Sequence, residues 1–272
     1  MDRGGRAGGI VGIYDSGVGG LSVLDAVRRL APAETLVYVA DTGHAPYGER
    51  TAAEVTARAL AVAAYFESRG AKAMVVACNT ATTAAIAEVR ARHPGLVVVG
   101  TEPAVKPAAR LTRSGVIGVF ATTGTLASPR FAELAQREAP GARILLAPCP
   151  QWVRMVERGC TQGEPARAGV AGPVRELREQ GADVLVLGCT HFPFLMDAIR
   201  GCAGEGVPVL ETGEAVARQL QRQLQARGRA APAGAPGACE LVSSGDPAAL
   251  AALARSLAGV EAPAGPLPAK YC

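Results

Sequence analysis

The chain has 272 residues, of which 49% are hydrophobic and 19% charged, and its formal net charge at pH 7 is +4. This length allows one large or two medium-sized domains with ordinary globular composition. The charge is too small to predict nucleic-acid binding, and no basic stretch is interleaved with aromatic residues. No apolar run approaches the roughly 20 residues of a membrane span, and the apolar segment 10–14 is too short for a signal peptide. We therefore expect a cytoplasmic protein without nucleic-acid or membrane partners.

Short apolar segments alternate with amphipathic segments along the chain. The apolar segments predict strands over 10–14, 35–40, 73–77, 96–99, 116–120, 143–147, 184–187, 207–210 and 240–243. The amphipathic segments predict helices over 21–30, 51–69, 81–91, 129–138, 165–180, 193–203, 213–226 and 247–257. Most of the strands are apolar at consecutive positions, which indicates burial on both faces. The alternation predicts an α/β fold with mostly parallel sheets flanked by helices.

The two halves of the chain share a rough internal repeat. GIYDSGVGG is followed by VVACNTAT in the first half, and GVFATTGT by VLGCTHFP in the second. We expect two similar lobes, residues 1–100 plus 213–272 and residues 101–212. Ligands of such sheets bind beyond the carboxyl ends of the strands, so the active site is expected in the cleft between the lobes. Residues 229–237 predict a surface loop, and the tail from Ala262 onward is expected to be poorly ordered.

The cysteine pattern argues for free thiols. The seven cysteines contain no Cys-x-x-Cys pair, and only three histidines accompany them. In a reducing cytosol such a set predicts neither disulfides nor a structural zinc site, and we expect no bound metal.

Cys78 and Cys189 each follow a predicted buried strand, at the point where a loop or helix begins. Free backbone N–H groups and the helix dipole at such a position favour a thiolate. A single free cysteine is more often a small buried hydrophobic residue, but the matched positions of these two favour acid–base chemistry. The other five cysteines lack this context and are interpreted as structural.

The segment DSGVGG, from Asp15 to Gly20, follows the first predicted strand. Its glycines permit a tight turn with accessible backbone N–H groups. It matches neither the dinucleotide fingerprint nor a P-loop, and a carboxylate at Asp15 would repel phosphate. Asp15 and Ser16 therefore predict contacts with a substrate ammonium and carboxylate, with helix capping by Asp15 as the alternative.

Two further loops follow predicted strands. In DTGHAPYG, Pro46-Tyr47-Gly48 predicts a turn that presents backbone N–H groups and a phenol, the alternative being an ordinary surface turn. His44 alone is interpreted as a surface histidine. In ATTGT, around Thr123, the hydroxyls suit either a carboxylate or a helix cap.

His191 lies two residues beyond Cys189 and can reach the same pocket. An imidazole beside a thiol lowers the pKa of the thiol and assists proton transfer. Lone histidines are more often structural, but adjacency to a candidate base favours a functional role here. Glu157, in WVRMVERG, has no such signal, and its residue type alone predicts a surface glutamate.

Five segments in chain order, GIYDSGVGGLSVL, YVADTGHAPYG, ACNTAT, TLASPRF and LGCTHFPFL, resemble glutamate racemases of the cofactor-independent aspartate/glutamate racemase superfamily. The resemblance spans residues 10–217. It implies two α/β lobes and an isomerase that interconverts L-glutamate and D-glutamate without PLP or any other cofactor. It also implies supply of D-glutamate for peptidoglycan, and thus a role in cell-wall biogenesis and cell shape, in a bacterial cytoplasm. A homodimer is expected.

The resemblance also implies roles for individual residues. Cys78 and Cys189 match the two acid–base thiols, which act on the D- and the L-enantiomer respectively. Asp15 matches the acid beside the first thiol, and His191 and Glu157 match the residues that assist the second. The implied substrate-binding residues are Asp15, Ser16, Pro46, Tyr47, Gly48, Asn79, Thr80, Thr123, Thr190 and His191.

One departure and three alternatives accompany this interpretation. Glu211-Thr212-Gly213 stands where the family commonly has Asp-Ser-Gly, a chemically conservative change that leaves the local lobe contact open. Aspartate racemase is the alternative within the superfamily, although GCTH rather than GCTE favours glutamate. An inactive amino-acid-binding protein is disfavoured by the retention of both thiols, and a nucleotide-dependent enzyme by the missing fingerprints.

Overall fold

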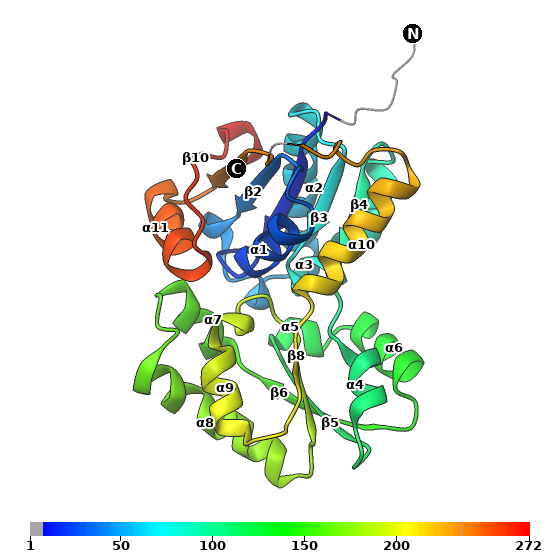
Figure 1. The fold of residues 1–272 in the computed structure, drawn as a ribbon, viewed down its shortest axis with the longest axis vertical. Coiled ribbons are helices and arrows are strands. Elements are labelled where there is room, and N and C mark those ends of the chain that lie inside the picture. The colour runs from blue at the N-terminus through cyan, green and yellow to red at the C-terminus, as the bar shows by residue number, and fades with distance from the viewer. Residues whose placement is uncertain (1–7, 235) are drawn as a thin grey trace. The chain divides into compact units, whose positions relative to one another are not determined.

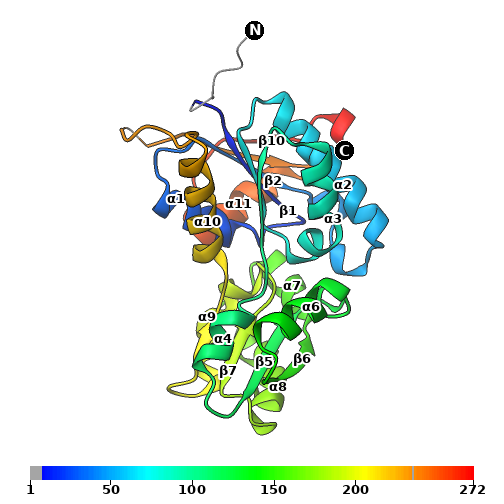
Figure 2. The same ribbon diagram turned by 90° about the vertical axis from the view of Figure 1, so that its right-hand side faces the viewer.

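The computed structural model describes residues 8–234 and 236–272, which divide into two compact units. Unit 1 comprises the described residues of Met1–Thr101 together with Gly213–Cys272, and unit 2 is Glu102–Thr212. Each unit has a parallel sheet with helices on both of its faces (Figures 1 and 2).

Unit 1 contains a six-stranded parallel sheet in the order β10-β9-β2-β1-β3-β4. Its strands are β1 (Val11–Asp15), β2 (Leu36–Ala40), β3 (Ala73–Val76), β4 (Val97–Gly100), β9 (Cys239–Ser243) and β10 (Ala264–Pro266). β1 pairs with β2 and with β3, and Tyr14 lies opposite both Val39 and Val76. Parallel pairing in this register brings the carboxyl ends of these three strands to the same edge of the sheet.

The helices of unit 1 cover both faces of this sheet. α1 (Leu21–Leu30), α10 (Gly213–Ala226) and α11 (Pro247–Ala258) lie on one face, and α2 (Ala52–Ser68) and α3 (Asn79–Arg92) on the other (Figures 1 and 2). Every residue of β1, β2 and β3 is buried, as expected for strands covered on both faces. A capping box between Thr51 and Glu54 fixes the start of α2.

Unit 2 contains a four-stranded parallel sheet in the order β6-β5-β7-β8. Its strands are β5 (Val116–Ala121), β6 (Arg143–Pro148), β7 (Val184–Leu187) and β8 (Val209–Leu210). Its helices are α4 (Val105–Leu111), α5 (Thr123–Leu126), α6 (Pro129–Glu138), α7 (Pro150–Glu157), α8 (Gly163–Glu179) and α9 (Met196–Ala203). α8 packs on α9, and α4 packs on α6, on opposite faces of the sheet (Figure 1). The predicted α/β class with mostly parallel sheets is therefore confirmed.

Two parts of the structure differ from the sequence prediction. α4, α5 and α7 were not predicted, because an apolar pattern needs more than their four to eight residues to stand out. The expectation of a poorly ordered tail is wrong: β10 pairs with β9, and Leu267 beyond it is buried. The proline-rich tail lacks a strand pattern, but an edge strand tolerates the missing N–H of Pro266.

Across the described residues, no helix combines the length and the apolar character that crossing a bilayer requires.

Candidate active site

Cys78 lies at the carboxyl end of β3 and is the N-cap residue of α3. Its side chain is buried, and its Sγ accepts a hydrogen bond from the backbone N–H of Ala81 over 3.4 Å. The thiol therefore sits at the positive end of a 14-residue helix, where free N–H groups and the helix dipole stabilise a negative charge.

Asp15 and Ser16 lie beside this thiol, because β1 and β3 are neighbouring parallel strands. The Cys78 thiol donates to the Ser16 Oγ at a distance of 3.7 Å, and the buried Asp15 carboxylate accepts from the N–H of Gly17 at 3.1 Å. A Cβ at Gly20 would lie 2.6 Å from the Cβ of Asp15, so this turn packs directly against the acid. Gly20 of DSGVGG thus permits close packing against Asp15.

Asn79 and Thr80 form the first turn of α3 and are both buried. The amide nitrogen and oxygen of Asn79 have no hydrogen-bond partner among the described residues. Because an unpaired buried amide is unfavourable, this side chain is suited to receive a polar ligand.

Tyr47 and Gly48 form a short 3₁₀ turn, η2 (Tyr47–Glu49), which follows Pro46. The Tyr47 phenol is buried and donates to Oδ2 of Asp41 at 2.5 Å, while its oxygen lies 2.5 Å from the hydroxyl of Tyr14. The side chain is thus bound into the interior of unit 1, which leaves the backbone of the turn as the part that can contact a ligand.

The second thiol, Cys189, follows β7 in unit 2 and is also buried. Its Sγ lies 3.7 Å from Nδ1 of His191, and Nε2 of His191 lies 2.7 Å from Oε1 of Glu157. Burial disfavours the charged imidazole, but the interactions with Cys189 and Glu157 outweigh it and raise the pKa of His191 well above its usual value. An imidazolium held between a thiol and a carboxylate can both stabilise a thiolate and pass on a proton.

α7 brings Glu157 to His191, although the two residues are far apart in sequence. The helix is anchored by Trp152, whose fully buried ring packs against Phe120 at 4.8 Å and Phe192 at 5.0 Å between ring centroids. Its indole N–H donates to the carbonyl of Gly169 at 3.0 Å. The packing of Trp152 against Phe120 and Phe192 therefore places Glu157, and the residues next to Glu157 in the sequence do not predict this position.

Two more predicted residues of unit 2 lie at strand ends. Thr190 is buried beside Cys189, whereas Thr123 is the exposed first residue of α5, just beyond β5. β5 and β7 are neighbours, so Thr123 and Thr190 lie at the same edge of the sheet. In each unit, the predicted residues at the strand ends therefore gather at one edge, joined in unit 2 by Glu157 from α7.

The remaining cysteines have other environments. Cys149 is fully buried, and burial together with the nearby Cys189 and Glu176 raises the pKa of its thiol to about 12, so it stays protonated at neutral pH. Cys160 and Cys272 are exposed, and Cys202 and Cys239 are half-buried. Within the described ranges, no group of three or more His, Cys, Asp or Glu side chains is arranged to hold a metal ion.

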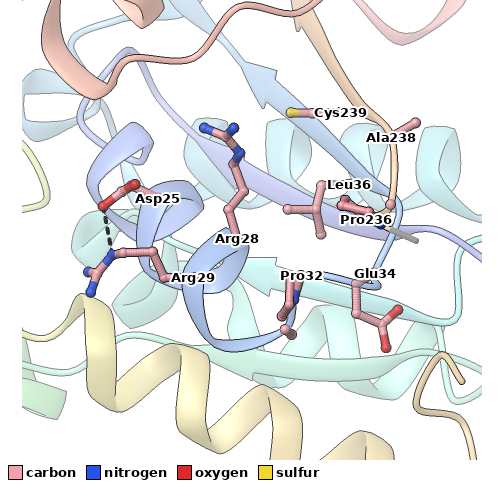
Figure 3. A pocket seen from close by; sticks show the side chains of 11 residues that line it. Asp25, Arg28, Arg29, Pro32, Glu34, Leu36, Pro236, Ala238 and Cys239 are labelled. Atoms are coloured by element: carbon pink, nitrogen blue, oxygen red, sulfur yellow. Dashed lines mark hydrogen bonds and ion pairs between the residues drawn. The ribbon is translucent and has the colours of Figure 1, made fainter. Parts of the chain in front are cut away.

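A cavity of unit 1, of about 270 Å³, lies elsewhere (Figure 3). Leu36 and Cys239, which line it, begin β2 and β9, so it lies at the amino ends of these strands. Cys78 lies at the carboxyl end of the same parallel sheet, and the cavity contains none of the predicted site residues.

Comparison with known proteins identifies the family of the chain. Residues 17–220 match the family described as Asp/Glu/Hydantoin racemase. A glutamate racemase of Ectopseudomonas mendocina is 52% identical over 214 residues, which cover 79% of this chain and 81% of the relative.

Two solved structures are similar over nearly the whole chain. A glutamate racemase isoform of Bacillus anthracis has a TM-score of 0.87 at 28% identity, covering 97% of this chain and 99% of that one. Escherichia coli glutamate racemase, solved with L-glutamate and the activator UDP-MurNAc-ala, has a TM-score of 0.80 at 30% identity, covering 94% and 99%. The family match alone extends over more than half of the sequence, and the chain therefore belongs to the Asp/Glu/Hydantoin racemase family.

Proposed function

We propose that this protein is a glutamate racemase that interconverts L-glutamate and D-glutamate by means of two thiols and without a cofactor. The observation that carries the proposal is the pair of buried cysteines, each just beyond the carboxyl end of a central strand and each beside a group that stabilises a thiolate. The glutamate racemases among the relatives, and the L-glutamate bound to the Escherichia coli enzyme, support glutamate as the substrate.

The reaction needs two groups because the α-carbon must lose a proton from one face and gain one on the other. One cysteine, as a thiolate, removes the α-proton and becomes a thiol. The carbanion, which is stabilised next to the substrate carboxylate, then takes a proton from the other cysteine, which becomes a thiolate. Atoms and charges balance without any further reactant. One glutamate must lie within reach of both thiols, which start in opposite protonation states.

The roles of the two thiols follow from the family resemblance. Cys189 removes the proton from L-glutamate and Cys78 from D-glutamate, and each returns a proton in the opposite direction. The hydrogen-bonded His191 and Glu157 support proton transfer at Cys189. Asp15 supports proton transfer at Cys78.

Substrate binding is assigned to groups at the strand ends. The amide of Asn79, which is buried and has no hydrogen-bond partner in the part of the chain that the structure describes, supports a contact with a polar substrate. Backbone N–H groups and hydroxyls at these positions are suited to the two carboxylates of glutamate and, in the transition state, to the developing charge. The binding residues proposed are Asp15, Ser16, Pro46, Tyr47, Gly48, Asn79, Thr80, Thr123, Thr190 and His191.

The proposed product sets the biological role. D-Glutamate made in the cytoplasm would be consumed in peptidoglycan synthesis, which links the enzyme to cell-wall biogenesis and cell shape. We further propose that it acts as a homodimer.

The test follows L-glutamate in deuterated water with no cofactor added. We expect loss of optical activity together with deuterium at the α-carbon, abolished in Cys78→Ala and in Cys189→Ala but retained in Cys160→Ala, which removes an exposed thiol. Exchange with aspartate but not with glutamate would assign the protein to aspartate racemase. Exchange with neither amino acid would exclude the enzymatic proposal and leave a binding protein.

A further inference from the structure

Asp41 follows β2, at the strand end that precedes the Tyr47–Gly48 turn, and its carboxylate is completely buried. A buried carboxylate requires several donors. It receives a hydrogen bond from the Tyr47 phenol at 2.5 Å, and Nδ1 of His44 lies 3.1 Å from its other oxygen. Although the sequence favours a surface role for His44, its half-buried side chain is part of this group.

The main partner of Asp41 is Arg58 on α2, whose side chain is only 12% exposed. Nε of Arg58 donates to Oδ2 of Asp41 at 2.9 Å, and Nη2 donates to Oδ1 at 3.0 Å. This is the two-point geometry that a guanidinium supplies and an ammonium does not. Burial opposes the charge of Asp41, but hydrogen bonds, above all from Arg58, hold its pKa below the usual value and keep it ionised.

Arg58 is itself held by the segment that the sequence predicted to be poorly ordered. Nη2 of Arg58 also donates to the backbone carbonyl of Tyr271 at 2.8 Å. The Tyr271 ring packs edge-on against Tyr65 of α2, with ring centroids 5.5 Å apart. Leu267, earlier in this segment, is buried, and its N–H donates to the carbonyl of Ser243 at 2.6 Å. The guanidinium of Arg58 is thus held by Asp41 and by the carbonyl of Tyr271.

Besides Asp41, the Tyr47 phenol contacts the hydroxyl of Tyr14 on β1, the strand that pairs with β3 next to Cys78. Tyr47 gives its only hydroxyl proton to Asp41, so the short contact with Tyr14 must use the Tyr14 proton. A directed chain therefore runs from Tyr14, on the strand next to Cys78, through Tyr47 to Asp41 and Arg58.

We propose that Arg58 is a positioning residue for substrate binding: it fixes Asp41, which holds the Tyr47 phenol and thereby the backbone of the Tyr47–Gly48 turn, with Tyr271 as its support. This inference rests on the proposed function, because the substrate contacts of the turn are assigned there. The described hydrogen bonds of Arg58 are with Asp41 and with the carbonyl of Tyr271, neither of which is assigned to the substrate or to a thiol, so its loss should weaken binding more than it slows proton transfer.

The kinetic test compares Arg58→Ala and Arg58→Lys with the full-length protein. For Arg58→Ala we expect the KM for glutamate to rise by about 10-fold or more and kcat to change by less than about 3-fold, with the pH profile of kcat/KM keeping its shape. Added guanidinium ions should lower this KM again. Lysine offers one-point contact, so Arg58→Lys should lie between Arg58→Ala and the unaltered protein.

The matched control is Arg92→Ala, which removes an arginine from an exposed ion pair with Glu88 on α3. Its kinetics should equal those of the unaltered protein. A KM that is unchanged in both Arg58 variants would overturn the inference. A fall in kcat at constant KM would also overturn it, because it would indicate a role in the chemical step.

Hydrogen–deuterium exchange separates this inference from the proposed function, since it needs no turnover. In Arg58→Ala and Arg58→Lys, amides of residues 42–50 should exchange faster, whereas those of β7 should not change. A variant ending at Pro268 should show a smaller increase in the same peptide. If the unaltered protein racemises glutamate but residues 42–50 exchange at the original rate in every variant, only the positioning role fails. If exchange rises but the unaltered protein has no activity, only the proposed function fails.

Discussion

The surroundings of the two candidate thiols differ, although both thiols follow central strands of parallel sheets. Cys78 is the N-cap of the 14-residue helix α3, and its Sγ contacts the backbone N–H of Ala81 and the hydroxyl of Ser16. Cys189 is followed by a short 3₁₀ turn, η3 (Phe192–Leu195), and α9 begins only at Met196. In place of a helix start, the second thiol has the imidazole of His191 beside it, and this imidazole pairs in turn with the carboxylate of Glu157.

The difference indicates two ways to stabilise a thiolate in one protein. A helix N-terminus provides fixed partial charges that do not titrate in the physiological range. An imidazolium provides a full charge but loses it when the pH rises above its pKa. Proton transfer at Cys189 should therefore depend on the state of His191, whereas helix-start stabilisation at Cys78 should not titrate.

The largest expected effect comes from His191→Asn, which removes the charge beside Cys189. L- and D-glutamate have equal free energy, so kcat/KM must fall equally in both directions, by about 10²- to 10⁴-fold. The asymmetry appears in isotope effects. Removal of the α-proton from L-glutamate by Cys189 becomes rate-limiting, so α-deuterated L-glutamate should give a large substrate isotope effect. With D-glutamate, the slow step is proton return from Cys189, so the substrate effect should shrink and the solvent effect should grow.

His93→Asn is the control for this experiment, since that imidazole pairs with Glu67 at the end of α3, outside both thiol groups. Its isotope effects should match those of the unaltered protein. Equal substrate isotope effects for both enantiomers in His191→Asn would contradict the assignment of His191 to Cys189.

A smaller effect is expected for Glu157→Gln, which keeps a hydrogen-bond acceptor but removes the charge. The carboxylate contributes to the raised pKa of His191, so the neutral amide should lower that pKa. The imidazole then loses its proton at a lower pH, and the alkaline limb of kcat/KM should move to lower pH. Loss of one charge-assisted hydrogen bond, about 1.5–3 kcal/mol, corresponds to a fall in kcat/KM of up to about 100-fold.

The raised pKa of His191 also makes the free energy of unfolding depend on pH. A raised folded-state pKa means that His191 stabilises the fold fully below its unfolded pKa of about 6.5 and loses this contribution as the pH rises through the folded value. Glu157→Gln should therefore reduce stability to urea more at neutral pH than at strongly alkaline pH. Glu164→Gln, which changes an exposed residue, is the control. An unshifted alkaline limb in Glu157→Gln would indicate that the carboxylate does not set the charge of His191.

Much of the fold was predictable because buried parallel strands are apolar at consecutive positions, as β3 and β7 are throughout. Their ends then locate Cys78 and Cys189 without further information. Glu157 could not be placed in this way, because its position depends on the packing of Trp152 between Phe120 and Phe192. Such contacts join segments that are far apart in the chain, so no repeating pattern of apolar residues near Glu157 predicts them.

Arg58 was missed for a related reason. In the sequence, Arg58 is an ordinary arginine of a predicted helix, and Arg69 at the end of the same helix looks no different. Only the contact of α2 with the residue that follows β2 reveals that Asp41 is its buried partner. The segment that holds it, residues 262–272, contains three prolines and lacks the run of apolar positions that a strand pattern needs, so neither periodicity nor propensity predicts β10. An edge strand can form there because only one side of it must pair.

The smallest expected effect is that of Ser16→Ala, which tests whether the surroundings of Cys78 are as insensitive to pH as the helix start suggests. The Ser16 hydroxyl accepts from the thiol over 3.7 Å, and a single neutral hydrogen bond contributes about 0.5–1.5 kcal/mol. The kcat/KM should therefore fall by about 2- to 10-fold, measured beside Ser256→Ala, which removes a hydroxyl from α11. Because the hydroxyl does not titrate, the pH profile should keep both limbs. A shifted limb in Ser16→Ala would mean that Ser16 controls the charge at Cys78, and the contrast between the helix start at Cys78 and the imidazolium at Cys189 would not hold.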